Sequence, residues 1–425
     1  MPPDTERSHL ALAGKRVVLL LQGGGALGAY QVGAYTALAQ ACRAAGNAVS
    51  WVGGISIGAL NAAVIAGPQG RDAAAELEHL WSEILSPPFP PFDWTAAWAN
   101  IPERLRAGWL APLAPKYTDW TWTAFNPAGQ QNFFGSRVLD PLHNPWFLQW
   151  GGPLEADQLA FYDTATLRKT LDVHVDWASI NRGGGMRLSL GATRVRDGEV
   201  VFFNTFESQN PLWHRRDASV EQVLASSALP PAFPPIWVDG ELYCDGGVST
   251  NTPIEALAEE LTAGTAADTI VFLVDLWDRK GSIPRSLDDL YWRQKSIAYG
   301  SRKDAAVSVV DTHQLEVEAK RIPPTRLDVC QVMLEWPHGD ARQFAFADAD
   351  FSQTAHAQLC ELGRDDMRSA IAQPHRVPGV GGAFAALYRY GTHAKHCETD
   401  RAYAQVRERK QRRRSAYETA AEPTR

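Results

Sequence analysis

The chain has few cysteines and no long apolar run, and each shortage excludes a class of protein. Its five cysteines are scattered, odd in number and contain no C-x-x-C pair, so neither a disulfide framework nor a zinc site is expected. The strongest apolar runs, Val17 to Leu21 and Ala59 to Ala66, are far shorter than the roughly 20 residues that span a bilayer. Residues 1–16 mix acids, bases and prolines instead of forming a secretory signal, which predicts a soluble cytoplasmic protein.

A strong positive charge is also missing. The 425 residues carry a net charge of -7 at pH 7, so a nucleic-acid partner is not expected. One basic cluster lies near the end of the chain, where residues 407–414 have the sequence RERKQRRR. This cluster could make a peripheral contact with an anionic membrane surface or could be a solvated tail, and the sequence leaves both open.

Strands alternate with helices from residue 15 to residue 276. The β-branched and leucine-rich run Val17 to Leu21 predicts a strand buried on both faces. A helix over 29–42, a strand over 50–55 and a helix over 57–66 follow, with later strands expected over 187–193, 200–203 and 269–276. This alternation predicts an α/β fold of three layers, with a mostly parallel central sheet flanked by helices.

The remaining composition predicts appendages to this fold. We expect an N-terminal tail over 1–14, a main domain over 15–280, a helical extension over 281–372 packed on that domain, and a polar tail over 373–425. The extension contains an expected helix over 355–372. Within the main domain, residues 81–150 hold eight of the fifteen tryptophans, interleaved with prolines, which predicts an aromatic-rich insertion or cap over the sheet.

A candidate nucleophile stands between an expected strand and an expected helix. Gly54-Ile55-Ser56-Ile57-Gly58 is a G-x-S-x-G motif, in which a sharp turn exposes the serine hydroxyl. Gly54 and Gly58 would let the backbone pass closely, and the N-terminus of the following helix would favour negative charge near the serine. The same pattern could also be a glycine-flanked serine that only caps a helix.

A glycine loop follows the first expected strand. Gly23-Gly24-Gly25-Ala26-Leu27-Gly28 matches the G-x-G-x-x-G pattern of dinucleotide sites, but such sites need an acidic residue about twenty positions later. Residues 17–70 contain no Asp or Glu, which disfavours a nucleotide-dependent oxidoreductase. The bare backbone N–H groups of Gly23, Gly24 and Gly25 could instead form an oxyanion hole, or the glycines could serve only close packing.

A serine nucleophile needs a base, and no histidine occupies a suitable glycine-rich loop late in the chain. An aspartate does, in Asp245-Gly246-Gly247. By itself this tripeptide is more often a turn than a catalytic site. It is the combination with the two earlier motifs that makes Asp245 a candidate base.

These three spaced motifs together resemble the patatin-like phospholipases, over roughly residues 16–276. Further similar segments surround the aspartate: Ala225-Ser226-Ser227-Ala228-Leu229-Pro230, Phe233-Pro234-Pro235 and Asn251-Thr252-Pro253. The resemblance implies a Ser56–Asp245 dyad without histidine, an oxyanion hole of Gly23 to Gly25, motif glycines at Gly28, Gly54, Gly58, Gly246 and Gly247, and no metal or cofactor. The segment from about 282 to 372 resembles an extension in a bacterial subgroup of that family.

The resemblance implies a lipid or acyl-ester substrate and hydrolysis through an acyl-enzyme. Many relatives carry Arg or Lys where this chain has Leu27, which leaves neutral esters, thioesters and polyester-like substrates open. Two alternatives share the fold: an acyltransferase or transacylase, and a non-catalytic lipid-binding scaffold. The tryptophans of residues 81–150 could face an acyl chain or simply pack a second layer.

The dyad also predicts a pH dependence. A carboxylate with its reference pKa of about 3.9 is a weak base, and a partly desolvated site would raise that pKa. We therefore expect activity to fall on the acid side in a single step, with no histidine titration.

Overall fold

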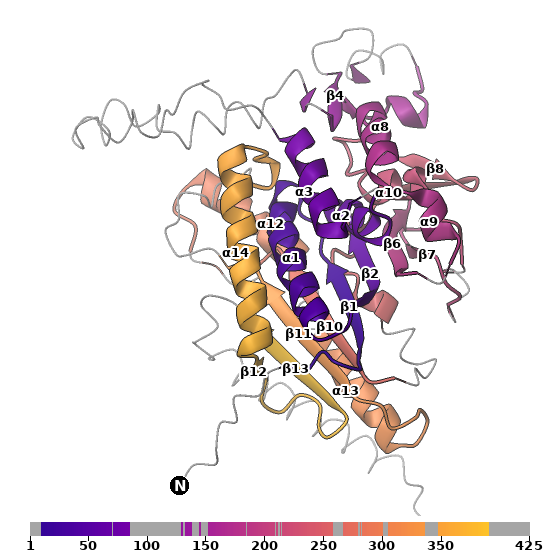
Figure 1. Ribbon diagram of the computed structural model, residues 1–425. Helices are drawn as coiled ribbons and strands as arrows, with labels where there is room; N and C mark the ends of the chain where they lie inside the picture. The colour runs from indigo at the N-terminus through magenta and orange to yellow at the C-terminus, as the bar shows by residue number, and fades with distance from the viewer. Residues whose placement is uncertain are drawn as a thin grey trace, which may run out of the picture.

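The computed structural model (Figure 1) describes residues 10–69, 71–85, 129–137 without 131, 144–145, 152–257 apart from 184, 209, 211–212 and 214, 267–300 apart from 279–280 and 282, 305–335 and 347–390. Residues 86–128 of the aromatic-rich insertion and the basic cluster at 407–414 lie outside these described residues. Among the helices of the described part, none is long and apolar enough to cross a bilayer.

A mixed sheet forms the centre of the described structure, in the order β12-β13-β11-β10-β1-β2-β6-β9-β8, with β7 also paired to β6. The six strands from β13 to β6 run parallel, while β7, β8, β9 and β12 pair antiparallel with their neighbours. The bounds are β1 Arg16–Leu21, β2 Val49–Ile55, β6 Arg187–Arg194, β7 Val200–Asn204, β8 Ile236–Val238, β9 Glu241–Asp245, β10 Thr269–Asp275, β11 Leu327–Met333, β12 His375–Arg376 and β13 Ala385–Tyr390.

Helices flank this sheet, as the sequence predicted. Figure 1 shows α1 and α14 side by side across the front of the sheet. Their backbones touch, because a Cβ on Gly33 would stand 1.8 Å from the carbonyl oxygen of Cys360. The helices are α1 Gly28–Ala44, α2 Ile57–Ala66, α3 Ala73–Ile84, α8 Ala165–His174, α9 Trp177–Asn181, α10 Val220–Ser226, α12 Leu287–Tyr299, α13 Ala305–Glu318 and α14 Gln353–Ala372, with short turns η1 Gly25–Leu27, η4 Ala156–Gln158, η5 Gly246–Val248 and η6 Ala347–Ala349.

The C-terminal region differs from the expected appendage. β11 and β13 extend the central sheet beyond β10, and α14 packs on α1, so residues 281–372 share the core of the main domain. The structure also places residues 375–376 and 385–390, which the sequence assigned to a polar tail, in β12 and β13. The run Ala385 to Leu387 is completely buried, which explains why so short an apolar segment joins the sheet.

The described part of the aromatic-rich insertion contributes to two elements. Trp81 belongs to α3 and is fully buried, where its indole stacks on the ring of Phe351. Residues 129–136 form part of a small antiparallel sheet, β3 Gly129–Gln130, β4 Phe134–Ser136 and β5 Tyr162–Asp163. This sheet forms one wall of the site described next.

Candidate active site

Ser56 stands at a strained turn between β2 and α2. Its φ of 56° and ψ of -126° lie in a region that non-glycine residues rarely adopt. The turn requires the glycines on either side, since a Cβ on Gly54 would stand 2.1 Å from the Gly58 carbonyl oxygen and one on Gly58 would stand 2.3 Å from the Leu21 carbonyl oxygen. The local sequence therefore builds the sharp strand-to-helix turn that was predicted.

Two serines at the C-terminal end of α10, Ser226 and Ser227, hold this turn in place. The Ser56 amide donates to Ser226 Oγ at 3.0 Å, and Ser226 Oγ in turn donates to the Gly191 carbonyl at 2.6 Å. Ser227 Oγ donates to the Ser56 carbonyl at 3.3 Å. The motif Ala225 to Pro230 thus supports the strained backbone, a role that the sequence alone did not assign to it.

Asp245 reaches Ser56 because of the strand order. Ile55 of β2 pairs with Gly191 of β6, and the next residue, Ala192, pairs with Asp245 of β9. The carboxylate accepts hydrogen bonds from the Ser56 side chain and from the Gly247 amide, the latter at 2.7 Å. The structure therefore brings the two predicted residues into direct contact.

The environment of Asp245 changes its acidity. The residue is only 2% exposed, and burial raises the pKa of its carboxyl to about 6, while the hydrogen bonds from Ser56 and Gly247 act in the opposite direction. A Cβ on Gly246 would stand 2.6 Å from the Gly191 carbonyl oxygen, so only glycine lets β9 turn this closely against β6. A carboxylate with this pKa can accept a proton from a hydroxyl near neutral pH.

The glycine loop lies directly beside Ser56. A Cβ on Gly23 would stand 3.0 Å from Ser56 Cβ, and the Gly23 carbonyl accepts from Asn251 Nδ2 at 2.9 Å and from Trp277 Nε1 at 2.8 Å. The Gly23 amide donates to the Asn251 carbonyl at 3.3 Å. Of the three predicted oxyanion donors, Gly24 and Gly25 are those whose amides have no acceptor within the described residues.

Two further loop positions, Leu27 and Gly28, face the interior of the protein. Gly28 packs under α2, where a Cβ would stand 2.6 Å from Ile57 Cγ1. Leu27 is fully buried in the core and does not line the cavity beside Ser56. An arginine or lysine side chain at position 27 would therefore have to extend out of the core to reach a substrate in the cavity.

Gln22 is a site residue that the sequence analysis missed. Its Oε1 accepts from the Leu276 and Trp277 amides at 2.6 and 3.2 Å, and its Nε2 donates to Thr252 Oγ1 at 3.1 Å. These bonds tie the start of the glycine loop to the end of β10. The sequence offered one clue: the polar Gln22 stands directly between the apolar run Val17 to Leu21 and the glycines.

Ser56 and Asp245 open into a cavity of about 330 Å³. Its walls are mostly apolar and aromatic, and its described lining contains no histidine, lysine or arginine. The walls come from the glycine loop, the small β3-β4-β5 sheet, the segment after α10, and the C-terminal extension. The lining aromatic residues are Phe133, Phe134, Tyr162, Phe233, Trp277, Tyr299 and Phe351.

The C-terminal extension contributes polar groups to the cavity. Asp348 pairs with Lys295 Nζ at 2.7 Å, and burial raises the pKa of its carboxyl despite that partner. Tyr299 also lines the cavity, and burial raises the pKa of its hydroxyl to about 12. Neither residue was predicted, because both are far from the motifs in sequence.

The family of the chain follows from comparison with known proteins. The family model for patatin-like phospholipase matches residues 19–258, more than half of the chain. The chain therefore belongs to the patatin-like phospholipase family, and the family supports lipid acyl hydrolase activity in general terms.

Comparisons with individual proteins add little to this assignment. Among solved structures, VipD from Legionella pneumophila is similar over 82% of this chain and 67% of its own, with 13% sequence identity and a TM-score of 0.32. No curated protein matches the chain.

Proposed function

We propose that the protein is a serine acyl hydrolase that cleaves lipid acyl esters, with Ser56 as nucleophile and Asp245 as base. One observation carries the proposal: the hydroxyl of Ser56, on a strained turn, hydrogen-bonds to the buried carboxylate of Asp245 at the wall of an apolar cavity. A residue held in such a backbone conformation, next to a group with a raised pKa, is typical of a catalytic site.

In the proposed reaction Asp245 accepts the Ser56 proton while Ser56 Oγ attacks the ester carbonyl carbon. The carbonyl oxygen becomes an oxyanion, which the backbone amides of Gly24 and Gly25 would stabilise. Collapse of this intermediate breaks the ester bond, and the leaving alcohol takes the proton from Asp245. Water then attacks the acyl-enzyme, again losing a proton to Asp245, and the carboxylic acid leaves as Ser56 regains its proton.

The cavity supports an acyl chain as the bound group. Aromatic side chains line it, and its size falls at the lower end of the usual range for ligand pockets, roughly 300–1,000 Å³. The described lining offers carboxylates and no cation, so it gives an anionic headgroup no ion-pair partner. We therefore propose a neutral ester, or a lipid whose charged part remains outside the cavity.

A series of p-nitrophenyl esters with acyl chains of increasing length tests this function. Wild type should release p-nitrophenol with every chain that fits the cavity, and Ser56→Ala should not. Glycerol added as acceptor separates hydrolysis from acyl transfer, since a transferase would form new glyceryl ester. If wild type cleaves no ester, even with lipid vesicles present, the fold serves as a lipid-binding scaffold instead.

A further inference from the structure

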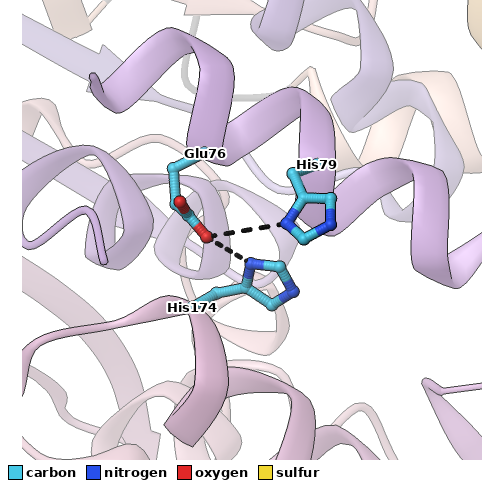
Figure 2. Close-up of side chains that lie close together, drawn as sticks. All are labelled: Glu76, His79 and His174. Atoms are coloured by element: carbon cyan, nitrogen blue, oxygen red, sulfur yellow. Dashed lines mark hydrogen bonds and ion pairs between the residues drawn. The ribbon is translucent and has the colours of Figure 1, made fainter. Parts of the chain in front are cut away.

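Two histidines and a glutamate meet between α3 and α8, away from the cavity. Glu76 and His79 stand one turn apart on α3, and His174 is the last residue of α8. Figure 2 shows the two imidazoles and the carboxylate pointing toward one another. None of the three residues lines the cavity beside Ser56, so the proposed acyl hydrolase reaction does not use them.

The ligand atoms of this cluster lie at metal-binding range. One carboxylate oxygen and one ring nitrogen from each histidine all lie within 4.8 Å of one another. His174 Nδ1 is 2.6 Å from Glu76 Oε1, and His79 Nδ1 is 3.9 Å from the same oxygen. The side chains of Glu76 and His174 are 1% and 0% exposed, while that of His79 is 38% exposed, so the cluster is buried but reachable from one side.

A second carboxylate faces the outer nitrogens of both rings. Glu83 Oε1 is 3.4 Å from His79 Nε2, and Glu83 Oε2 is 3.3 Å from His174 Nε2. That buried His174 nitrogen has no hydrogen-bond partner within the described residues. Histidines that bind a metal through one nitrogen commonly donate the other N–H to a carboxylate, and Glu83 stands where it could serve both rings.

Arg71 marks where a cation would bind. One of its guanidinium nitrogens lies 2.8 Å from His79 Nδ1 and 3.1 Å from Glu76 Oε2. Because arginine only donates, His79 Nδ1 must present its lone pair to this positive group, as it would to a metal ion. The side chain of Arg71 is 48% exposed, so it can leave the cluster without unfolding it.

We propose that Glu76, His79 and His174 bind a divalent transition metal of the zinc class, with Glu83 as the shared outer carboxylate. Two imidazoles and one carboxylate are a donor set that suits zinc and leave a fourth position for water. Binding displaces Arg71, and the proton that His174 Nδ1 shares with Glu76 moves to His174 Nε2, where Glu83 can accept it in a hydrogen bond. Tetrahedral ligands at zinc bond lengths lie roughly 3.4 Å apart, so the observed nitrogen-to-oxygen distances need only sub-ångström changes.

The location gives the ion a structural role in the acyl cavity. It would tie α3 to α8, and both helices hold the segment that carries Phe133 and Phe134. Gln130 Nε2 donates to the Ile84 carbonyl of α3 at 2.6 Å, and Thr170 Oγ1 of α8 donates to the Asn132 carbonyl at 2.7 Å. A bound ion thus fixes the wall of the cavity without touching the substrate.

Titration of the full-length, chelator-treated protein with Co²⁺ tests the proposal, because a cobalt site built from nitrogen and oxygen ligands gives visible absorption bands. Wild type should bind one Co²⁺ per chain, and Zn²⁺ should displace it. His79→Gln should abolish the bands, Glu83→Gln should weaken binding by about 10- to 100-fold, and the exposed His375→Ala should change nothing.

Arg71→Ala provides the most discriminating variant, because removing the competing guanidinium should increase the affinity for Co²⁺. Circular dichroism confirms that each variant is folded, and the half-exposed His79 is the ligand least needed for the core. The proposal is overturned if neither wild type nor Arg71→Ala binds one Co²⁺, or if His79→Gln binds it as wild type does.

Discussion

The backbone carbonyl oxygen of Asp348 lies 2.1 Å from the position that a Cβ on Gly25 would take. Gly25 also has a φ of +55°, which favours glycine independently of this contact. The C-terminal extension therefore closes directly over the glycine loop proposed to stabilise the oxyanion. The extension is part of the site, rather than an addition to a finished domain.

Gly25→Ala should lower kcat by about 10²-fold or more, because the added methyl must push the loop away from Asp348 and displace an oxyanion donor. Gly46→Ala is the matched control, since Gly46 has a φ of +64° but nothing within 4 Å of its added Cβ. Kinetics with one p-nitrophenyl ester compare the two. Equal loss of activity in both variants would show that the Asp348 contact has no special importance.

Asp245→Asn should make the protein more stable at pH 8 while inactivating it. The folded-state pKa of about 6 lies above the ordinary aspartate value of 3.8, so the favourable contribution of the protonated carboxyl is complete below pH 3.8 and is lost as the pH rises through about 6. One pKa unit corresponds to about 1.4 kcal/mol, so the gain at pH 8 should be roughly 3 kcal/mol. Urea unfolding at pH 4 and pH 8 measures it, and an equal gain at both pH values would contradict the buried charge.

The acid side of the kcat/KM profile should fall with a slope of one through about pH 6, because Asp245 must be ionised to accept a proton. His356→Ala should leave this profile unchanged, since no histidine lies in the described lining of the cavity. Rates across pH 4–9 provide the measurement. A limb that disappears when one histidine is replaced would identify an imidazole as the base.

Phe134→Ala should reduce kcat/KM for long acyl chains by about 10- to 100-fold and leave short chains unaffected, because burial against one aromatic side chain contributes roughly 1.5–3 kcal/mol. Phe134 lines the cavity, in edge contact with Tyr162 and Phe233. Phe206→Ala is the control, because that ring packs on Trp51 outside the cavity. A uniform loss across chain lengths would indicate a general structural effect.

Local motifs were sufficient to predict the turn geometry at the centre of the candidate site. α2 begins and ends where its apolar run predicted, and Gly54 is needed because a Cβ there would meet the Gly58 backbone four residues later. Asp245 was found through its adjacent glycines, and the structure places it on Ser56. The turn at Ser56 depends on short-range geometry, which a sequence motif records directly.

The surroundings of the site depend on contacts between distant residues. Gln22 bonds to Thr252, and Asp348 reaches Gly25, across separations that no local pattern reveals. The strands β11 and β13 were missed because their place depends on pairing with strands that are distant in sequence: β11 pairs with β10, and β13 pairs with β11. Trp81 similarly belongs to α3 and the core, although the tryptophan-rich and proline-rich composition of residues 81–150 suggested an insertion.

Labelling with a fluorescent fluorophosphonate, followed by peptide mass spectrometry, tests the central claim most directly. Wild type should carry one adduct on Ser56, Ser56→Ala should carry none, and folded Asp245→Asn should label more slowly by about 10²- to 10⁴-fold, since its base is lost. An adduct on another residue, undiminished labelling of Ser56→Ala, or no labelling of wild type with lipid present would contradict the Ser56–Asp245 dyad.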